Sequence, residues 1–151
     1  DVYKRQTHVV WFTLANSIGT RPIMTKLRVL IVEDEPIIAT LLAEVLMELG
    51  HVVSGIAGSE PEVVRETNRC RPDLMIVDAH LRQGSGLTAV AAVLKDGFIP
   101  HVFVSGDRLT KSLLGPEAIV LQKPFREADL VRAIARALNE AKPLTQETPN
   151  R

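Results

Sequence analysis

Short apolar runs alternate with stretches of helical periodicity along most of the chain. The runs that predict strands cover residues 27–32, 52–57, 74–77, 102–104 and 119–121. The stretches that predict helices cover residues 36–49, 59–70, 87–95, 107–115 and 127–141, the fourth leaving room for only a brief helix. Strands that are apolar on both faces and separated by helices are typical of a parallel sheet covered on both sides. The pattern therefore predicts an α/β fold built on a doubly wound, five-stranded parallel sheet.

Local signals support the predicted helix boundaries. Along the first predicted helix, apolar residues recur at helical spacing, and Gly50 ends it. Its apolar positions are Ile38, Leu41, Leu42, Val45, Leu46 and Leu49. The second helix opens with a capping-box pattern, in which Glu62 follows Ser59 after three residues. The segment 84–86, Gly-Ser-Gly, lacks the neighbouring residues of a phosphate-binding loop and predicts a turn before the third helix.

Polar residues follow four of the five predicted strands. Because crossover connections are right-handed, the carboxyl ends of parallel strands meet at one edge of the sheet, where open sheets of this kind bind ligands. The residues at these tips are Glu33-Asp34-Glu35, Asp78, Ser105 and Lys123-Pro124. A charge at the end of a buried strand is unfavourable unless something pairs with it. The tips therefore predict a functional site.

The carboxylates at this edge predict a cation. Two carboxylates about 5 Å apart repel by roughly 3 kcal/mol at an effective dielectric near 20. A cluster that offers only oxygen ligands suits Mg²⁺, which binds few carboxylates and keeps several waters. We expect Asp34 to bind the metal directly and Glu33 through water, with Asp78 and the backbone carbonyl of His80 completing the set.

A magnesium ion with open positions invites a phosphoryl group. Lys123 and the hydroxyl of Ser105 would flank that group as a point charge and a hydrogen-bond donor. Asp78 is then the predicted nucleophile, whose carboxylate attacks phosphorus to give an aspartyl phosphate. Simpler readings stay open: the acidic residues can serve only to cap the first helix, which is the role we expect for Glu35. Ser105 can be an ordinary strand-end hydroxyl and Lys123 a solvated charge.

Four motifs in order carry a family resemblance. They are LIVEDE, LMIVDAHL, FVSG and LQKPF, each at a strand tip. Together they resemble the receiver domain of bacterial response regulators over roughly residues 26–142. The resemblance implies a flavodoxin-like fold with strand order 2-1-3-4-5, and phosphotransfer from a histidine kinase or histidine phosphotransfer protein. It implies a signalling switch rather than a turnover enzyme, with self-catalysed phosphorylation and autodephosphorylation.

The resemblance also assigns individual residues. It implies a cis peptide between Lys123 and Pro124, and an effect of the His80 and Asp107 side chains on the lifetime of the phosphoryl group. The family often carries an aromatic residue where this chain has Val120. The usual coupling of a hydroxyl residue to an aromatic switch therefore cannot operate here. With the brief fourth helix, this predicts an altered or flexible face formed by the fourth helix, fifth strand and fifth helix.

Composition and charge limit the partners. The chain has 151 residues, of which 46% are hydrophobic, and its formal net charge is zero. These values suit one domain with a core and give no basic surface for nucleic acid. A single cysteine, Cys70, cannot form an internal disulfide and favours the cytoplasm. The expected partners are the phosphodonor and a downstream protein target, with no membrane; weak homodimerisation stays open.

The two ends of the chain lack the pattern of the domain. We expect residues 1–23 to be an extension outside the fold, with Met24 as the natural start, residues 24–142 to form the receiver domain, and residues 143–151 to be disordered. The apolar run at residues 9–15 is too short to span a bilayer. No output domain is recognisable after the last helix, so we expect a stand-alone receiver.

Three rival readings stay open beside the receiver. The first is a pseudo-receiver, an interaction scaffold that does not need phosphate, which Val120 favours. The second is a metal-dependent phosphatase, although such enzymes need a second aspartate where this chain has His80. The third is a fragment of a hybrid kinase.

Overall fold

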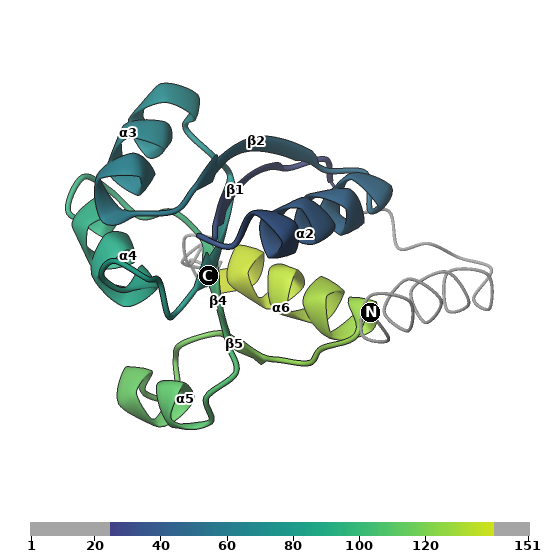
Figure 1. Cartoon of the computed structure of the whole chain (residues 1–151). Coiled ribbons are helices and arrows are strands. Elements are labelled where there is room, and N and C mark those ends of the chain that lie inside the picture. Colours follow the sequence, from purple (N-terminus) through teal and green to yellow (C-terminus); the bar gives the residue numbers. More distant parts are fainter. Residues whose placement is uncertain (1–24, 141–151) are drawn as a thin grey trace, which may run out of the picture.

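The computed structural model describes residues 25–140, which form five strands and five helices in alternation. The predicted extension at residues 1–23 and the predicted disordered tail at residues 143–151 lie outside the described residues. The elements in order are β1 Arg28–Val32, α2 Pro36–Glu48, β2 Val52–Ala57, α3 Glu60–Cys70, β3 Leu74–Asp78, α4 Gly86–Leu94, β4 His101–Ser105, α5 Leu109–Leu114, β5 Val120–Gln122 and α6 Glu127–Glu140 (Figure 1).

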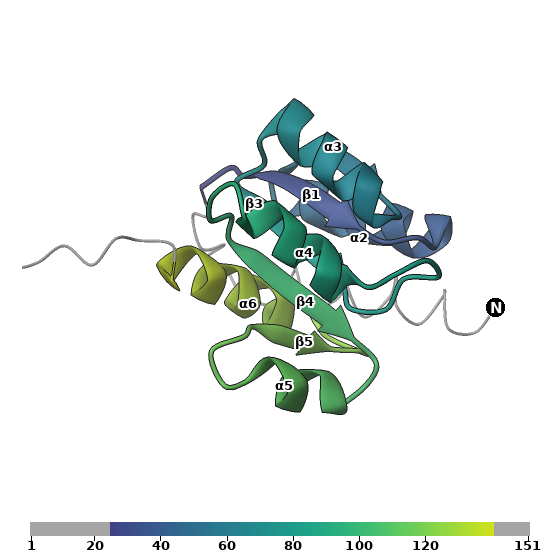
Figure 2. The same cartoon turned by 90° about the vertical axis from the view of Figure 1, so that its left-hand side faces the viewer.

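All five strands lie in one parallel sheet with the order β2-β1-β3-β4-β5, as predicted. Helices α2 and α6 cover one face, and α3 and α4 cover the other (Figures 1 and 2). Along β1, Val29 and Ile31 join the core under α2 and α6, whereas Leu30 and Val32 join the core under α3 and α4. This double burial explains why β1 and β3, in the middle of the sheet, consist almost entirely of apolar residues.

The register of the strands brings their carboxyl ends together. Val32 of β1 pairs with Val77 of β3, which pairs with Phe103 of β4, and Ser105 pairs with Gln122 of β5. The residues that follow these positions therefore lie side by side along one edge of the sheet. This confirms the expected convergence of the polar strand tips.

Helix α2 forms where predicted, but its buried face differs from the predicted apolar stripe. Ala39, Ala43 and Leu46 are buried against the sheet, whereas Ile38 and Leu41 are 41% and 36% exposed. The two alanines are small enough to let the helix backbone approach the strands closely. Ile38 and Leu41 lie at the side of the helix in contact with solvent, whereas Leu42, Val45 and Leu49 are partly buried against the core, as the stripe predicted.

The start of α3 corrects the capping-box prediction. Ser59 occupies the N-cap position, but its side chain makes no capping hydrogen bond. The Glu62 carboxylate instead accepts from the backbone N–H of Gly58, with 2.7 Å between Oε2 and N. The glutamate therefore holds the loop one residue before the position that the motif predicts.

The connection from β3 to α4 is fixed by a close backbone approach. Gly84 has a φ of +86°, and the Ser85 side chain caps α4 by accepting from the N–H of Leu87 at 3.0 Å. A Cβ atom on Gly86 would lie 1.9 Å from the carbonyl oxygen of Asp78. The chain therefore bends before α4 as predicted, although Gly86 already belongs to the helix, and the start of α4 lies directly against Asp78.

Helix α5 has six residues and lies beside β5 at the edge of the sheet (Figure 2). The prediction of a reduced fourth helix is confirmed. No helix among residues 25–140 has the length and apolar character needed to cross a membrane.

Gly86→Ala should lower the free energy of unfolding by about 2 kcal/mol or more, because the added methyl group overlaps the Asp78 backbone. Urea denaturation measures the effect. Gly106→Ala is the control, since a Cβ there meets no atom within 4 Å, and it should change stability by less than about 0.5 kcal/mol. Equal losses in the two variants would contradict the close approach.

Candidate functional site

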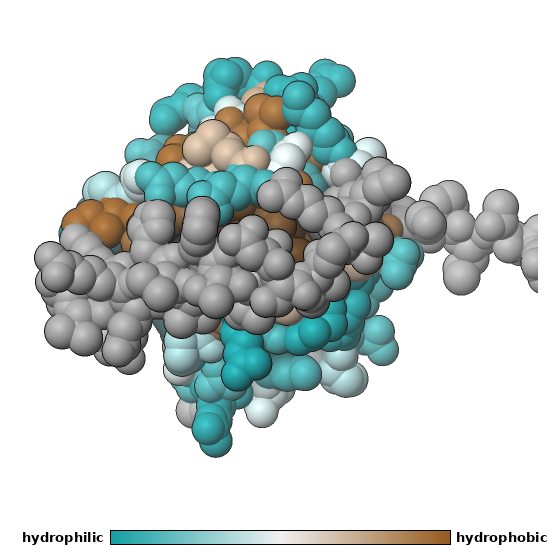
Figure 3. Space-filling model, turned by 90° about the vertical axis from the view of Figure 1, so that its right-hand side faces the viewer, coloured by the Kyte–Doolittle hydropathy of each residue, from teal (hydrophilic) through white to brown (hydrophobic). Residues whose placement is uncertain are grey.

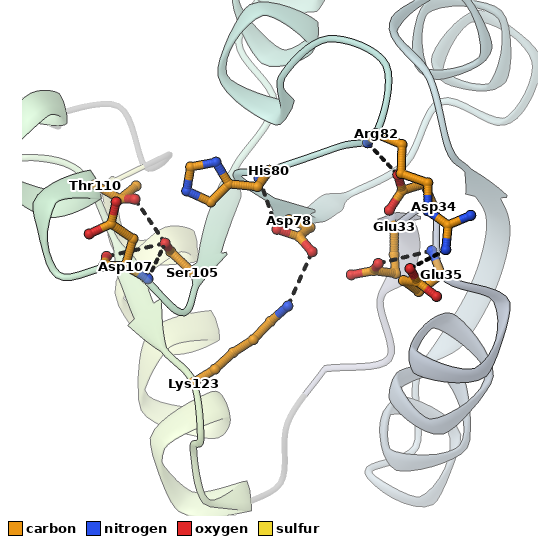
Figure 4. A network of polar contacts seen from close by, with 10 residues as sticks. All are labelled: Glu33, Asp34, Glu35, Asp78, His80, Arg82, Ser105, Asp107, Thr110 and Lys123. Atoms are coloured by element: carbon orange, nitrogen blue, oxygen red, sulfur yellow. Dashed lines mark hydrogen bonds and ion pairs between the residues drawn. The ribbon is translucent and has the colours of Figure 1, made fainter.

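Asp78 lies at the centre of the strand-tip edge and is only 9% exposed. Its Oδ1 accepts from the backbone N–H of His80 at 2.9 Å, and its Oδ2 accepts from Lys123 Nζ at 3.1 Å (Figure 4). Lys123 reaches this position from the end of β5, and its peptide bond to Pro124 is cis, as predicted. The ion pair is the compensation that a nearly buried carboxylate requires.

Glu33 brings a second carboxyl group to Asp78. It follows β1, is 5% exposed, and accepts from the backbone N–H of Glu35 at 3.0 Å. Burial, and next the hydrogen bond to Asp78, raise the pKa of Glu33 to about 7, although Lys123 acts in the opposite direction. Near neutral pH, Glu33 is therefore about half protonated and can donate a hydrogen bond to Asp78.

Asp34 and Glu35 turn toward the loop between β3 and α4 (Figure 4). The Asp34 carboxylate accepts from the backbone N–H of Arg82, and the Glu35 carboxylate pairs with the Arg82 guanidinium. Glu35 occupies the N-cap position of α2, as expected, but its side chain makes no capping hydrogen bond and pairs with Arg82 instead. Arg82 was missed by sequence reasoning, because its partners lie 47 and 48 residues earlier and no local pattern links them.

Ser105 lies at the same edge, but its hydroxyl is bound on the side of α5. It contacts Thr110 Oγ1 at 2.8 Å, accepts from the backbone N–H of Asp107 at 3.0 Å, and lies 3.2 Å from the Asp107 carbonyl oxygen (Figure 4). The backbone carbonyl of Ser105 accepts from the N–H of Lys123 at 2.8 Å. Thr110 is 2% exposed and is a second residue that the sequence motifs did not indicate.

A groove lies beside the site. It has a volume of about 540 Å³ and runs between the start of α2, the end of β2 and the loop after β3. Glu33, Asp34 and Arg82 are among its lining residues. Two of the three acidic residues therefore border a space that an ion or a partner molecule could enter.

The chemistry of the donor set fits magnesium. Glu33, Asp34 and Asp78 offer only carboxylate oxygens, which are the ligands that this hard cation prefers. Burial raises the pKa of Glu33 in spite of the nearby Lys123, so a bound cation would favour the ionised form of this carboxyl group. In the side-chain conformations that the structure shows for residues 25–140, no three His, Cys, Asp or Glu side chains lie close enough together to hold a metal ion. Direct ligation by Asp34 therefore requires its carboxylate to turn from Arg82 toward Asp78.

The family is shown by sequence comparison. The model of the response regulator receiver domain matches residues 29–135. The chain therefore belongs to the response regulator receiver family of two-component signalling. Membership matches the observed strand order and the position of the acidic residues at the strand tips.

Two curated relatives align with about three quarters of this chain. The regulator PhyR of Methylorubrum extorquens is 36% identical over 114 residues, covering 73% of this chain and 43% of PhyR. The transcriptional regulatory protein PdtaR of Mycobacterium tuberculosis is 33% identical over 122 residues, covering 78% of this chain and 60% of PdtaR. The chain thus spans about half the length of these relatives.

Solved receiver structures superpose on the fold. The receiver domain of Erythrobacter litoralis PhyR gives a TM-score of 0.69 at 28% identity and covers 86% of this chain and 99% of that domain. Brucella abortus PhyR gives 0.66 at 32% identity and covers 78% of this chain and 50% of that protein.

Glu33→Gln should stabilise the domain more at pH 8 than at pH 4.5. The raised pKa means that the protonated form of Glu33 favours folding, and this contribution is lost as pH rises from about 4.5 through about 7. Glutamine stays neutral, so urea denaturation in chelator should show its advantage growing by about 1–3 kcal/mol over this range. Glu48→Gln, on the exposed side of α2, is the control and should show no such trend. A constant difference for both variants would contradict the proposed burial of Glu33.

Proposed function

We propose that this domain is a phospho-accepting switch, in which Asp78 takes a phosphoryl group from a histidine kinase or a histidine phosphotransfer protein. The observation that supports this most directly is the nearly buried Asp78 carboxylate paired with Lys123 at 3.1 Å, at the open edge of a receiver fold. The remaining exposed part of this carboxylate lies at the edge where a donor would approach, and the lysine is placed to neutralise charge that the donor brings.

The transfer follows from the chemistry of the two groups. A carboxylate oxygen of Asp78 attacks phosphorus, the bond from phosphorus to the donor imidazole nitrogen breaks, and that nitrogen keeps the electron pair. Lys123 stays close enough to bind an oxygen of the transferred group. Mg²⁺, held by Glu33, Asp34, Asp78 and the backbone carbonyl of His80, would neutralise charge on the phosphoryl oxygens. His80 and Asp107 flank the site and would control the access of water to the aspartyl phosphate.

The surface beside the site supports a protein as phosphodonor. Ile37, Ile38 and Leu41 of α2 are 55%, 41% and 36% exposed, and the helix begins at the groove that Glu33 and Asp34 line. On the face of the domain that lies to the right in Figure 1, further brown, apolar surface lies among polar residues (Figure 3). An exposed apolar strip next to a reactive group suits docking of a donor helix more than capture of a small molecule.

The phosphorylated domain would act by binding another protein. PhyR of Bartonella quintana, 31% identical to this chain, is described as an anti-anti-sigma factor. We infer by analogy that this chain acts in the cytoplasm on a protein target, without contact with nucleic acid. The domain would be a signalling module rather than a turnover enzyme, although it would catalyse its own phosphorylation and slow dephosphorylation.

A scaffold that works without phosphate is the second candidate. It is favoured by Val120, which replaces the aromatic residue common in the family and cannot take part in the usual switch. The pairing of Asp78 with Lys123 argues against it, because a scaffold has no need of a nearly buried charge at this edge.

Wild-type protein incubated with Mg²⁺ and acetyl phosphate should gain roughly 80 Da, the mass of one added PO₃ unit, in intact mass spectrometry. Asp78→Asn should gain nothing while remaining folded, because asparagine keeps the acceptor for the His80 N–H and removes the nucleophile. Incubation with a phosphorylated histidine kinase repeats the comparison with a protein donor. Uptake by Asp78→Asn, or no uptake by the wild type from either donor, would refute Asp78 as the acceptor.

Millimolar Mg²⁺ should raise the Tm of the wild type by a few degrees, because an ion that binds only the folded acidic cluster stabilises it by mass action. Asp34→Asn should lose most of this shift. Asp96→Asn, in an exposed loop outside the site, should keep it. An unchanged Tm in the wild type, or the same shift in all three proteins, would exclude the proposed magnesium site.

A further inference from the structure

The hydroxyl of Ser105 is held by the segment that leads into α5. Ser105 and Thr110 are 1% and 2% exposed, and their hydroxyl oxygens lie 2.8 Å apart. The backbone of Asp107 provides two further contacts to the same hydroxyl. The residue that would bind the phosphoryl group is thus occupied by partners from the α5 side (Figure 4).

The backbone around Ser105 is fixed by its neighbours. Its carbonyl oxygen accepts from the N–H of Lys123, and the carbonyl of the preceding residue, Val104, accepts from Ala79 at 3.0 Å. The hydroxyl can therefore change partners by rotation about χ1 without displacement of β4. Rotation between staggered wells is the ordinary motion of a serine side chain.

Helix α5 has limited attachment to the rest of the domain. It is short, and among the described elements it is not packed extensively against any helix or strand. Leu114 packs against the core on the α4 side, whereas Leu113 is 80% exposed. The buried contact between Thr110 and Ser105 is therefore a significant part of what joins this helix to the sheet.

We propose that Thr110 is a positioning residue, which holds the Ser105 hydroxyl away from Asp78 until a phosphoryl group arrives. This inference rests on the proposed function, because it requires Ser105 to bind the phosphorylated Asp78. A χ1 rotation that turns the Ser105 hydroxyl toward Asp78 carries its Oγ away from Thr110 Oγ1, whichever of the two hydroxyl groups donates in that contact.

The loss of that contact explains how the signal would reach the surface. A buried hydroxyl without a hydrogen-bond partner is unfavourable. Movement of Thr110 toward water then restores a hydrogen bond to its hydroxyl, and this movement displaces the start of α5. Val120, which pairs with Phe103 in the sheet, offers no polar group to replace Thr110 as the partner of Ser105. Occupancy of Asp78 and the position of α5 are thereby coupled through two hydroxyl groups.

Beryllofluoride with Mg²⁺, a mimic of the phosphoryl group, tests the coupling. Its Kd is measured for the wild type, Thr110→Val, Thr110→Ser, Ser105→Ala and the double variant, and urea denaturation verifies that each is folded. Thr110→Val should bind about 2- to 10-fold more tightly than the wild type, because its free state no longer holds Ser105 by a hydrogen bond worth about 0.5–1.5 kcal/mol. Thr110→Ser should restore the wild-type Kd.

The Ser105→Ala background separates positioning from structure. There, Thr110→Val should leave the Kd unchanged, since no serine hydroxyl remains to be held. In the wild type, amide NMR signals of residues 107–114 should shift on binding of the mimic, and in Ser105→Ala they should not. An equal effect of Thr110→Val in both backgrounds, or no effect in either, would overturn the role of Thr110. No binding of the mimic by the wild type would instead overturn the proposed function, and this inference with it.

Discussion

The pairing of Asp78 with Lys123 is the interaction on which the rest of the site depends. A carboxylate that is 9% exposed needs a cation close to it, and the structure supplies one from β5, 45 residues later in the chain. The hydrogen bond from the Lys123 N–H to the Ser105 carbonyl fixes the end of β5 beside β4. Pairing of the two charges thus requires the complete sheet, and it brings β3, β4 and β5 to a common point.

One lysine does not balance all the negative charge at this point. Glu33 places a second carboxyl group beside Asp78. Burial raises its pKa to about 7, because its ionised form is unfavourable away from water. A domain selected only for stability would place a neutral side chain there. A cation bound at the proposed site would offset the cost of burying this second carboxyl group. The negative charge at this edge also explains why the loop after β3 reaches back to β1, where Arg82 contacts Asp34 and Glu35.

The sequence by itself determined the architecture and the members of the site. Apolar runs of strand length separated by helical periodicity predicted the element order, because a sheet buried on both faces leaves no room for polar alternation. Since all strands are parallel, the residue after each run had to lie at one edge, and Glu33, Asp34, Asp78, Ser105 and Lys123 followed from that rule. The family motifs added the strand order and the cis peptide at Lys123-Pro124, which periodicity alone does not contain.

Only the tertiary structure decided which partners these residues take. Arg82 meets Asp34 and Glu35 because a close backbone approach at Gly86 fixes the loop after β3, and no local pattern encodes that geometry. Thr110 binds Ser105 because a short helix follows β4, and Glu62 binds Gly58 rather than forming the predicted capping box. Sequence periodicity indicates which side chains are buried. Whether a hydrogen bond or ion pair forms depends instead on differences of a few tenths of an ångström in the distance between two groups. Those distances are set by loops that join distant segments, and they exist only after the sheet has formed.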